Sequence, residues 1–247
     1  MKITSIKTKK IIPFKQDIFS ILNKHLTEMP EQSILAVTSK IVSICENNVI
    51  EKGEMKKEEI AEWEADFYLP KRQNKYGFAL TIKNGILLPD AGVDESNGAG
   101  FYIPWPKDPQ KSANEILDYL KKRFKRKKIG VIITDSKTTP LRWGTTGVAI
   151  AYSGFSPLND YIGQPDIFGK ELRVTKANIM DALAVSAVLV MGEGKEQTPL
   201  ALIKEIPFVD FQKNHPSRKE LKNLNISLED DLYSELLKSV KLKKNKE

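Results

Sequence analysis

The amino-acid sequence predicts an α+β fold in which helices pack on mixed sheets. Strand-like and helix-like segments follow one another along the 247 residues without the steady alternation of a doubly wound sheet. The sequence contains neither a P-loop motif nor a GxGxxG turn after a strand. With 40% apolar and 29% charged residues, it has the composition of a globular protein with a sizeable core. These observations exclude a P-loop fold and a Rossmann core.

A buried strand and a hairpin are predicted in the N-terminal half. Residues 34–37 (ILAV) are consecutively apolar, which is typical of a short strand covered on both faces. Residues 78–82 and 85–88 flank Asn84-Gly85, a dipeptide that favours the tight turn of a β-hairpin.

A helix and a second buried strand are predicted next. Residues 112–115 (SANE) predict a capping box, with Ser112 as the cap of the helix. The helix is predicted to end in the basic residues 121–128, because cations complement the helix dipole there. Residues 129–134 (IGVIIT) predict a buried strand that ends at Asp135. The apolar face of the helix has the expected spacing: Ile116, Leu117, Leu120 and Phe124.

Two further strands, at residues 147–152 and 199–206, are predicted to flank another helix. Thr175 is predicted to cap this helix and Gly192 to end it. One face of the helix is apolar: Ile179, Leu183, Ala187 and Val190.

The last segment is predicted to be separate from the main domain. Residues 227–240 predict an amphipathic helix with four leucines facing inward: Leu228, Leu232, Leu236 and Leu237. We therefore expect a main domain at residues 1–225, followed by an amphipathic helix and a lysine-rich tail at residues 226–247.

The net charge of +7 is concentrated in two segments. Residues 121–128 hold seven basic residues, and residues 238–247 hold five lysines and one glutamate. Since these segments carry more than the whole excess, the rest of the chain is net acidic and no basic face for nucleic acid is expected. No apolar run approaches the roughly 20 residues of a membrane helix, and the first 14 residues do not resemble a signal peptide. A cytoplasmic protein is expected, with nucleic-acid binding as a less favoured alternative.

Nucleophilic catalysis is not expected from this sequence. His25 and His215 lie in polar stretches without a neighbouring nucleophile, which argues against a Ser-His-Asp or Cys-His mechanism. Cys45 follows an apolar stretch and is expected to be a small buried hydrophobe. As the only cysteine, it also excludes a multi-cysteine zinc site.

Three carboxylates at the ends of predicted elements are candidate cation ligands. Asp94 follows the hairpin, Asp135 ends a strand, and Glu193 follows the glycine that ends a helix. Carboxylate oxygens suit Mg²⁺ or Mn²⁺, and such cations stabilise phosphoryl transfer by neutralising the phosphates. Each residue also has a local explanation: an Asx-turn for Asp94 and Asn97, a loop cap for Asp135, and an exposed loop for Glu193. The residues alone leave both interpretations open.

Four stretches of the chain resemble the coenzyme F420-0:γ-glutamyl ligase family. The segment Ile12-Pro13-Phe14 precedes them and also matches the family. The four stretches have the order and spacing of the family. They are residues 37–43 (VTSKIVS), residues 90–97 (DAGVDESN), residues 130–135 (GVIITD) with Arg142 downstream, and residues 160–175 (DYIGQPDIFGKELRVT) continuing to residues 191–194 (MGEG).

The resemblance implies a site for two divalent cations and a nucleotide. One Mg²⁺ or Mn²⁺ ion would be held by Asp94 and Asp135, and a second by Ser136 and Glu193. The co-substrate would be GTP, with ATP as an alternative, and Arg142 would contact the substrate. The nucleotide site would comprise Pro13, Ser39, Lys40, Asn97, Met191, Gly192 and Gly194.

The resemblance also implies the reaction. In the family, a precursor carboxylate is phosphorylated to an acyl phosphate, which the amine of L-glutamate attacks to form an amide. Family members share an α+β fold and form intertwined homodimers, so a homodimer is expected here. This chemistry agrees with the residues, since it needs carboxylates and cations but no nucleophilic side chain.

The sequence departs from the family pattern at places that bear on the substrate. Ile44 stands where the family usually has a lysine, Ser136 replaces a threonine, and residues 137–144, a predicted loop, lack the usual Gly-Arg pair. Residues 103–109 and 226–233 instead resemble a bacterial subgroup assigned to folate metabolism. The acceptor is therefore expected to be coenzyme F420-0 or a folate. A non-catalytic nucleotide- or cofactor-binding module with the same fold is the alternative to a ligase.

Overall fold

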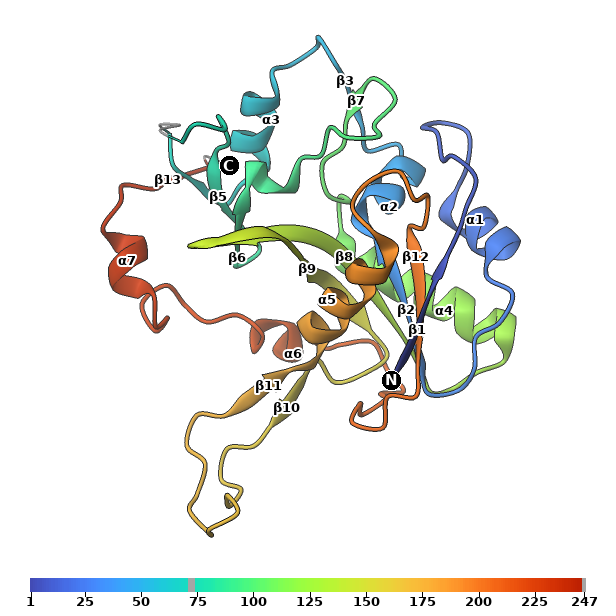
Figure 1. Cartoon of the computed structure of the whole chain (residues 1–247), viewed down its shortest axis with the longest axis vertical. Helices are drawn as coiled ribbons and strands as arrows, with labels where there is room; N and C mark the ends of the chain where they lie inside the picture. Colours follow the sequence, from blue (N-terminus) through green and yellow to red (C-terminus); the bar gives the residue numbers. More distant parts are fainter. Residues whose placement is uncertain (71–73, 246–247) are drawn as a thin grey trace.

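The computed structural model describes residues 1–70 and 74–245 and has a five-stranded sheet at its centre (Figure 1). Its strand order is β1-β12-β2-β8-β9, and every neighbouring pair is antiparallel except β2 and β8. Residues 2–6 near the N-terminus thus pair with residues 200–204 within one sheet. The strands are β1 (Lys2–Ile6), β2 (Ser33–Thr38), β8 (Ile129–Thr139), β9 (Arg142–Ser153) and β12 (Leu200–Lys204).

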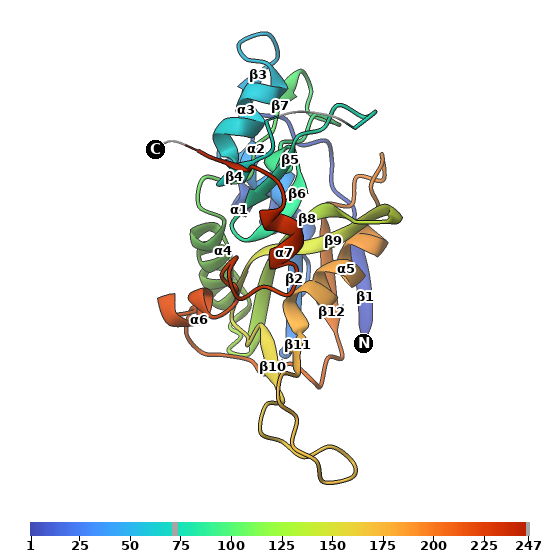
Figure 2. The same ribbon diagram turned by 90° about the vertical axis from the view of Figure 1, so that its left-hand side faces the viewer.

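Helices cover both faces of this sheet (Figure 2). One face packs against α1 (Ile18–His25), α2 (Ser39–Cys45) and α4 (Pro109–Phe124), and the other against α5 (Ile179–Met191). Successive side chains of a strand point to opposite faces, so Leu35 and Val37 join the first core cluster and Ile34 and Ala36 the second. This double burial is why residues 34–37 are all apolar.

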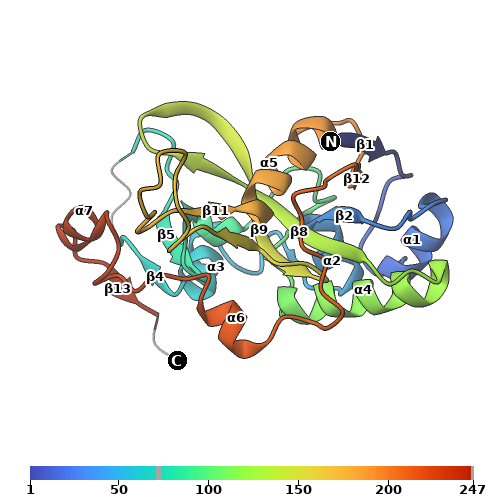
Figure 3. The ribbon, with the colours of Figure 1, turned by 90° about the horizontal axis from the view of Figure 1, so that it is seen from below.

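A four-stranded sheet of order β13-β4-β5-β6 lies at the end of the molecule away from α1 and β1 (Figure 3). Its strands are β4 (Phe67–Tyr68), β5 (Leu80–Lys83), β6 (Ile86–Pro89) and β13 (Lys243–Lys244). A two-stranded arm projects from the body (Figure 1) and consists of β10 (Leu158–Asp160) and β11 (Lys176–Asn178). The remaining elements are β3 (Ile50–Glu51), α3 (Lys57–Glu64), the 3₁₀ turn η1 (Asp90–Gly92), β7 (Phe101–Tyr102), α6 (Arg218–Lys222) and α7 (Ser234–Lys238).

The predicted α+β class is confirmed, and so are the buried strand at residues 34–37 and the hairpin around Asn84-Gly85. The first strand of that hairpin begins two residues later than predicted, at Leu80. Within residues 1–70 and 74–245, no helix is long and apolar enough to cross a membrane.

Two predicted helix caps are wrong. Helix α4 begins at Pro109, and Asp108 is its cap, because Asp108 Oδ1 accepts a hydrogen bond from the backbone N–H of Lys111 at 2.9 Å. Ser112 lies inside the helix, where its hydroxyl donates to Glu46 Oε1. Proline at the first helical position was the stronger signal, since its ring presets the helical φ angle.

For α5 the cap is Asn178, whose Oδ1 accepts from the backbone N–H of Asp181 at 3.0 Å, while Thr175 lies before β11. The predicted inner face is also wrong at Val190, which is exposed, whereas Val188 and Met191 are buried. The helix ends at Gly192, as predicted.

Strands β8 and β9 are longer than predicted. Asp135 does not end its strand, because β8 continues to Thr139, and residues 137–144 form the tip of the β8–β9 hairpin rather than a free loop. The pairing register shifts between Ile133 and Thr134, directly before Asp135. The extra residue at this shift is Ile150 on β9, and Asp135 lines the cavity from within β8 rather than from its end.

The predicted amphipathic helix at residues 227–240 is wrong. Only α7 is helical there, and Leu232 and Leu236 are exposed rather than inward-facing. In the lysine-rich tail, Lys243 and Lys244 form β13, which pairs with β4. The boundary at residue 225 stays a prediction.

The basic run at residues 121–128 has structural contacts. Arg123 donates to the carbonyls of Leu22 and Asn23 at the end of α1, and Arg126 donates to the carbonyl of Met29. Cations at a helix C-terminus stabilise its free carbonyls. These contacts account for the two arginines without a nucleic-acid partner.

Candidate functional site

A cavity of about 870 Å³ lies between α2, β8, the segment after the β5–β6 hairpin and the loop after α5. Residues 8–12, which follow β1, close one side. Nine of the twelve predicted site residues line it: Lys40, Asp94, Asn97, Asp135, Ser136, Met191, Gly192, Glu193 and Gly194. The fold thus gathers stretches from four distant parts of the sequence around one space.

Three consecutive left-handed residues turn the chain from β6 into this cavity. Asp90, Ala91 and Gly92 have φ angles of 49°, 51° and 73°. Left-handed backbone is unfavourable for residues with a side chain, so this turn needs outside support. The hydroxyl of Thr81, which is fully buried on β5, accepts the backbone N–H of Ala91 at 2.8 Å. The supported turn leads directly to Asp94.

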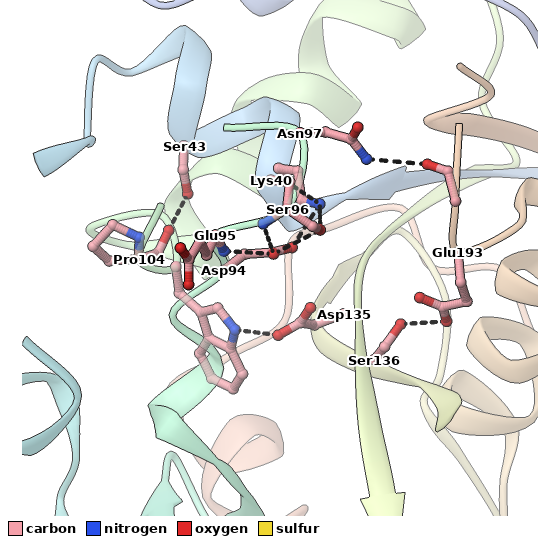
Figure 4. Close-up of polar contacts among 12 residues, drawn as sticks. Lys40, Ser43, Asp94, Glu95, Ser96, Asn97, Pro104, Asp135, Ser136 and Glu193 are labelled. Atoms are coloured by element: carbon pink, nitrogen blue, oxygen red, sulfur yellow. Dashed lines mark hydrogen bonds and ion pairs between the residues drawn. The ribbon is translucent and has the colours of Figure 1, made fainter. Parts of the chain in front are cut away.

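Asp94 is held by both of its carboxylate oxygens (Figure 4). Oδ1 accepts from the backbone N–H groups of Glu95 and Ser96 at 2.7 and 2.9 Å. These bonds form an Asx-turn at Asp94, which is one of the two interpretations that the sequence allows for this residue. Oδ2 lies 2.6 Å from Lys40 Nζ at the start of α2. Burial, the largest single effect, raises the pKa of Asp94, but the Lys40 ammonium and the hydrogen bonds from Ser96 together hold the net pKa below its ordinary value. Asp94 is therefore a charged group at the cavity wall.

Asp135 faces the same region from β8 and receives a hydrogen bond from the indole N–H of Trp105, which is fully buried (Figure 4). Desolvation raises the pKa of Asp135 to about 7, although the hydrogen bonds of Trp105 and the Ser136 backbone N–H lower it in part. The nearby charge of Asp94 raises the pKa further. The two carboxylates are thus close enough to interact, and a cation between them would relieve their repulsion.

The other predicted cation ligands are in direct contact. Ser136 Oγ donates to Glu193 Oε1 at 2.6 Å, and Asn97 Nδ2 donates to the carbonyl of Gly194 at 3.0 Å (Figure 4). These bonds join β8 and the segment after Asp94 to the loop after α5. Glu193 is exposed, so this loop presents it to the cavity rather than burying it.

The side chains at the cavity fit a hard divalent cation bound together with phosphate. Carboxylate and hydroxyl oxygens are the ligands that Mg²⁺ and Mn²⁺ prefer. Within the described ranges, however, no three His, Cys, Asp or Glu residues are grouped closely enough to hold a metal ion. The candidate ligands are two carboxylates, Asp94 and Asp135, and one carboxylate with a hydroxyl, Glu193 and Ser136. Either set would suit Mg²⁺, since it usually takes one or two carboxylates and completes its shell with water and phosphate oxygens.

Three predicted residues do not line the cavity. Pro13 and Ser39 are buried next to its wall, and Arg142 is exposed on β9. Sequence reasoning also missed Trp105 and Lys57. Lys57 lines the cavity and pairs with Asp90 at 3.0 Å, at the start of the left-handed turn. The sequence gives no signal for the bond of Trp105 to Asp135 or for the pair of Lys57 with Asp90, because each joins residues at least 30 positions apart.

The described cavity wall contains no histidine or cysteine. His215 pairs with Asp118 on α4, and His25 is the last residue of α1. The structure thus brings no Ser-His-Asp or Cys-His arrangement into this site.

Cys45 is expected to be unreactive in the folded protein. Burial raises the pKa of its thiol to about 12, and the charges of Asp17 and Glu46 add to this effect. Because the thiolate is the reactive form, alkylation by iodoacetamide at pH 8 should be at least roughly a hundredfold slower in the native than in the unfolded protein. Mass spectrometry of timed samples measures both rates, and rapid native labelling would contradict the burial of this thiol.

Comparison with known proteins gives consistent matches. The sequence model of the family described as F420-0:Gamma-glutamyl ligase matches residues 69–205. The chain is 38% identical to the coenzyme F420:L-glutamate ligase of Methanococcus maripaludis strain C6 over 72% of this chain and 78% of that protein. It is 33% identical to the protein of the same name from Methanothermobacter thermautotrophicus over 77% and 82%. For Methanopyrus kandleri the identity is 41% over 51% of each chain.

Proposed function

Because this chain belongs to the F420-0:γ-glutamyl ligase family, we propose that it joins L-glutamate to a carboxylate-bearing cofactor precursor, driven by GTP and assisted by divalent cations. The observation that carries the proposal is the meeting of Asp94, Asp135, Ser136 and Glu193 at one cavity with Lys40. A site with carboxylate and hydroxyl oxygens, several lysines and, in its described lining, no histidine or cysteine suits phosphoryl transfer between bound substrates.

The reaction proceeds in two steps. An oxygen of the acceptor carboxylate attacks the terminal phosphorus of the nucleotide, and the nucleoside diphosphate leaves. The amine of L-glutamate then attacks the carbonyl carbon of the acyl phosphate, inorganic phosphate leaves, and the amine loses a proton. Bound divalent cations would neutralise the charge that develops on the phosphates. Asp94 and Asp135 would hold such a cation, while Lys40 stabilises Asp94 in its ionised form.

Incubation with GTP or ATP, Mn²⁺, L-glutamate and either coenzyme F420-0 or a folate tests this proposal. We expect a product one glutamate heavier, with one nucleoside diphosphate released per amide formed. Nucleotide binding without a glutamylated product on either acceptor would instead support a non-catalytic module. The apolar Ile44, which is buried at the cavity wall, is the feature that favours that second candidate.

Glu193→Gln should reduce activity strongly while the melting temperature of the nucleotide-free protein barely changes, because the side chain is exposed. If Glu193 helps to hold a cation, raising the Mn²⁺ concentration should recover part of the activity, since added metal offsets a weakened ligand by mass action. Initial rates over a Mn²⁺ titration give the result.

Glu196→Gln is the matched control for that experiment. It removes the same charge from the same loop, but Glu196 Oε2 accepts the backbone N–H of Gly194 instead of facing Ser136. Its activity should not depend on added Mn²⁺ in this way. Full activity of Glu193→Gln at limiting Mn²⁺, or equal metal rescue of both variants, would rule out a ligand role for Glu193.

A further inference from the structure

Three exposed aromatic rings form a row that leads from the tip of the β8–β9 hairpin to the cavity. Trp143 meets Tyr76 edge to face at 6.3 Å between ring centroids, and Tyr76 stacks with Phe78 at 6.4 Å and 20°. The residues are 86%, 53% and 46% exposed, in that order. Phe78 also lines the cavity, so the row is continuous with it. We call these three residues the aromatic row.

Two lysines accompany the aromatic row. Lys75 Nζ lies 5.1 Å from the ring centroid of Tyr76 and 5.9 Å from that of Trp143, and Lys57 Nζ lies 5.5 Å from that of Phe78. Among the residues that the structure describes, no carboxylate forms an ion pair with Lys75. Lys57 is paired with Asp90, so the positive charge that a ligand would meet beside the aromatic faces is chiefly that of Lys75.

Packing within the chain does not account for this arrangement. Exposed aromatic side chains that lie together and border a cavity are typical of ligand-binding surfaces, because stacking replaces water on their faces. Aromatic faces bind flat rings of many kinds, since every such ring has a π face. Lysines beside them favour ligands with carbonyl oxygens or negative charge.

We propose that the aromatic row binds the planar heteroaromatic ring of the acceptor and that Lys75 contacts a polar or anionic group at its edge. This proposal rests on the proposed function, which requires an acceptor whose carboxylate reaches the terminal phosphate of a nucleotide bound in the cavity. A ring stacked at Phe78 lies at the cavity rim, so the chain attached to the ring can extend inward. The ligand class is a fused nitrogen heterocycle with an anionic chain, a description that a deazaflavin precursor and a folate share.

Trp143→Ala and Tyr76→Ala test the proposal by steady-state kinetics. Each should raise the KM for the acceptor about tenfold, the effect expected from loss of one stacking face, while kcat changes less than about twofold. The KM for GTP should be unchanged, and Trp143→Phe should restore most of the affinity. Phe168→Ala is the matched control, because Phe168 is exposed on the arm between β10 and β11 and should have no effect on KM.

Binding of the free ring separates this proposal from the proposed function. Equilibrium dialysis with lumichrome and with pterin, which lack the anionic chain, should show binding that Tyr76→Ala weakens about tenfold, even if no acceptor is glutamylated. Unchanged acceptor KM in both alanine variants, or ring binding equal to that of Phe168→Ala, would overturn the proposal. It would also fail if the variants changed only the sedimentation of the protein, because a second copy of the chain would then cover the row.

Discussion

Asp94→Asn and Asp135→Asn are each expected to abolish measurable ligation. Loss of a residue that merely orients a metal ligand costs roughly 10–100-fold, so loss of a ligand charge should cost more than about 100-fold. If the two carboxylates hold one cation, the double variant should be hardly slower than either single variant, because residues that serve one step are strongly non-additive. Single-turnover rates with saturating GTP, acceptor and Mn²⁺ give the comparison.

Asp160→Asn is a suitable control for these variants. Asp160 is an exposed carboxylate paired with Lys176 on the arm, outside the cavity, and its replacement removes the same charge. Its activity should stay near that of the wild type. Independent, multiplicative losses for Asp94 and Asp135 would argue against a shared cation, and near-normal activity of either single variant would remove that residue from the site.

Gly92→Ala is expected to have the largest effect on stability. A Cβ atom at this position would lie 2.1 Å from Trp105 Nε1 and 2.9 Å from Asp135 Oδ2, on a backbone with φ of 73°. The left-handed backbone costs roughly 1–2 kcal/mol and the overpacking roughly 1–3 kcal/mol. Thermal unfolding should therefore shift down by roughly 10 °C, and the hydrogen bond between Trp105 and Asp135 should be lost with it.

Gly163→Ala separates these two contributions. Gly163 has a similar φ of 81°, but no atom lies within 4 Å of the position of its Cβ. This variant should show only the smaller backbone cost. Equal shifts of the melting temperature for both variants would mean that Gly92 is not packed against Trp105. They would also contradict the role of the indole in supporting Asp135.

The elements that could be predicted from the sequence are those with a local signal. The ILAV run and the Asn84-Gly85 turn each specify their structure within a few residues. Asp94 and Asp135 became candidates on a similar local signal, as acidic residues at the ends of predicted elements, and both line the cavity. Residues 227–240 show the limit of this reasoning: their leucines have helical spacing, but Leu232 and Leu236 are exposed, so little apolar surface is buried to stabilise a long helix.

What could not be predicted depends on contacts between distant residues. Trp105 reaches Asp135 only because Gly92 leaves room for the indole, and the three residues lie in separate segments of the chain. The aromatic row likewise joins Tyr76 to Trp143, which lies 67 positions further along the sequence. Neither set of residues forms a motif.

The pairing of β1 with β12 has a consequence for how this chain folds. Residues 2–6 pair with residues 200–204 at the edge of the central sheet. This pairing therefore closes a loop that contains most of the chain. Lengthening a loop adds little to the entropy lost on closure, but such non-local pairing slows folding. Residues 8–12 and the loop at residues 192–198 adjoin these strands and form one wall of the cavity. The proposed nucleotide binding should therefore be among the last properties to return when the unfolded chain is diluted from denaturant, after most of the helical signal has recovered.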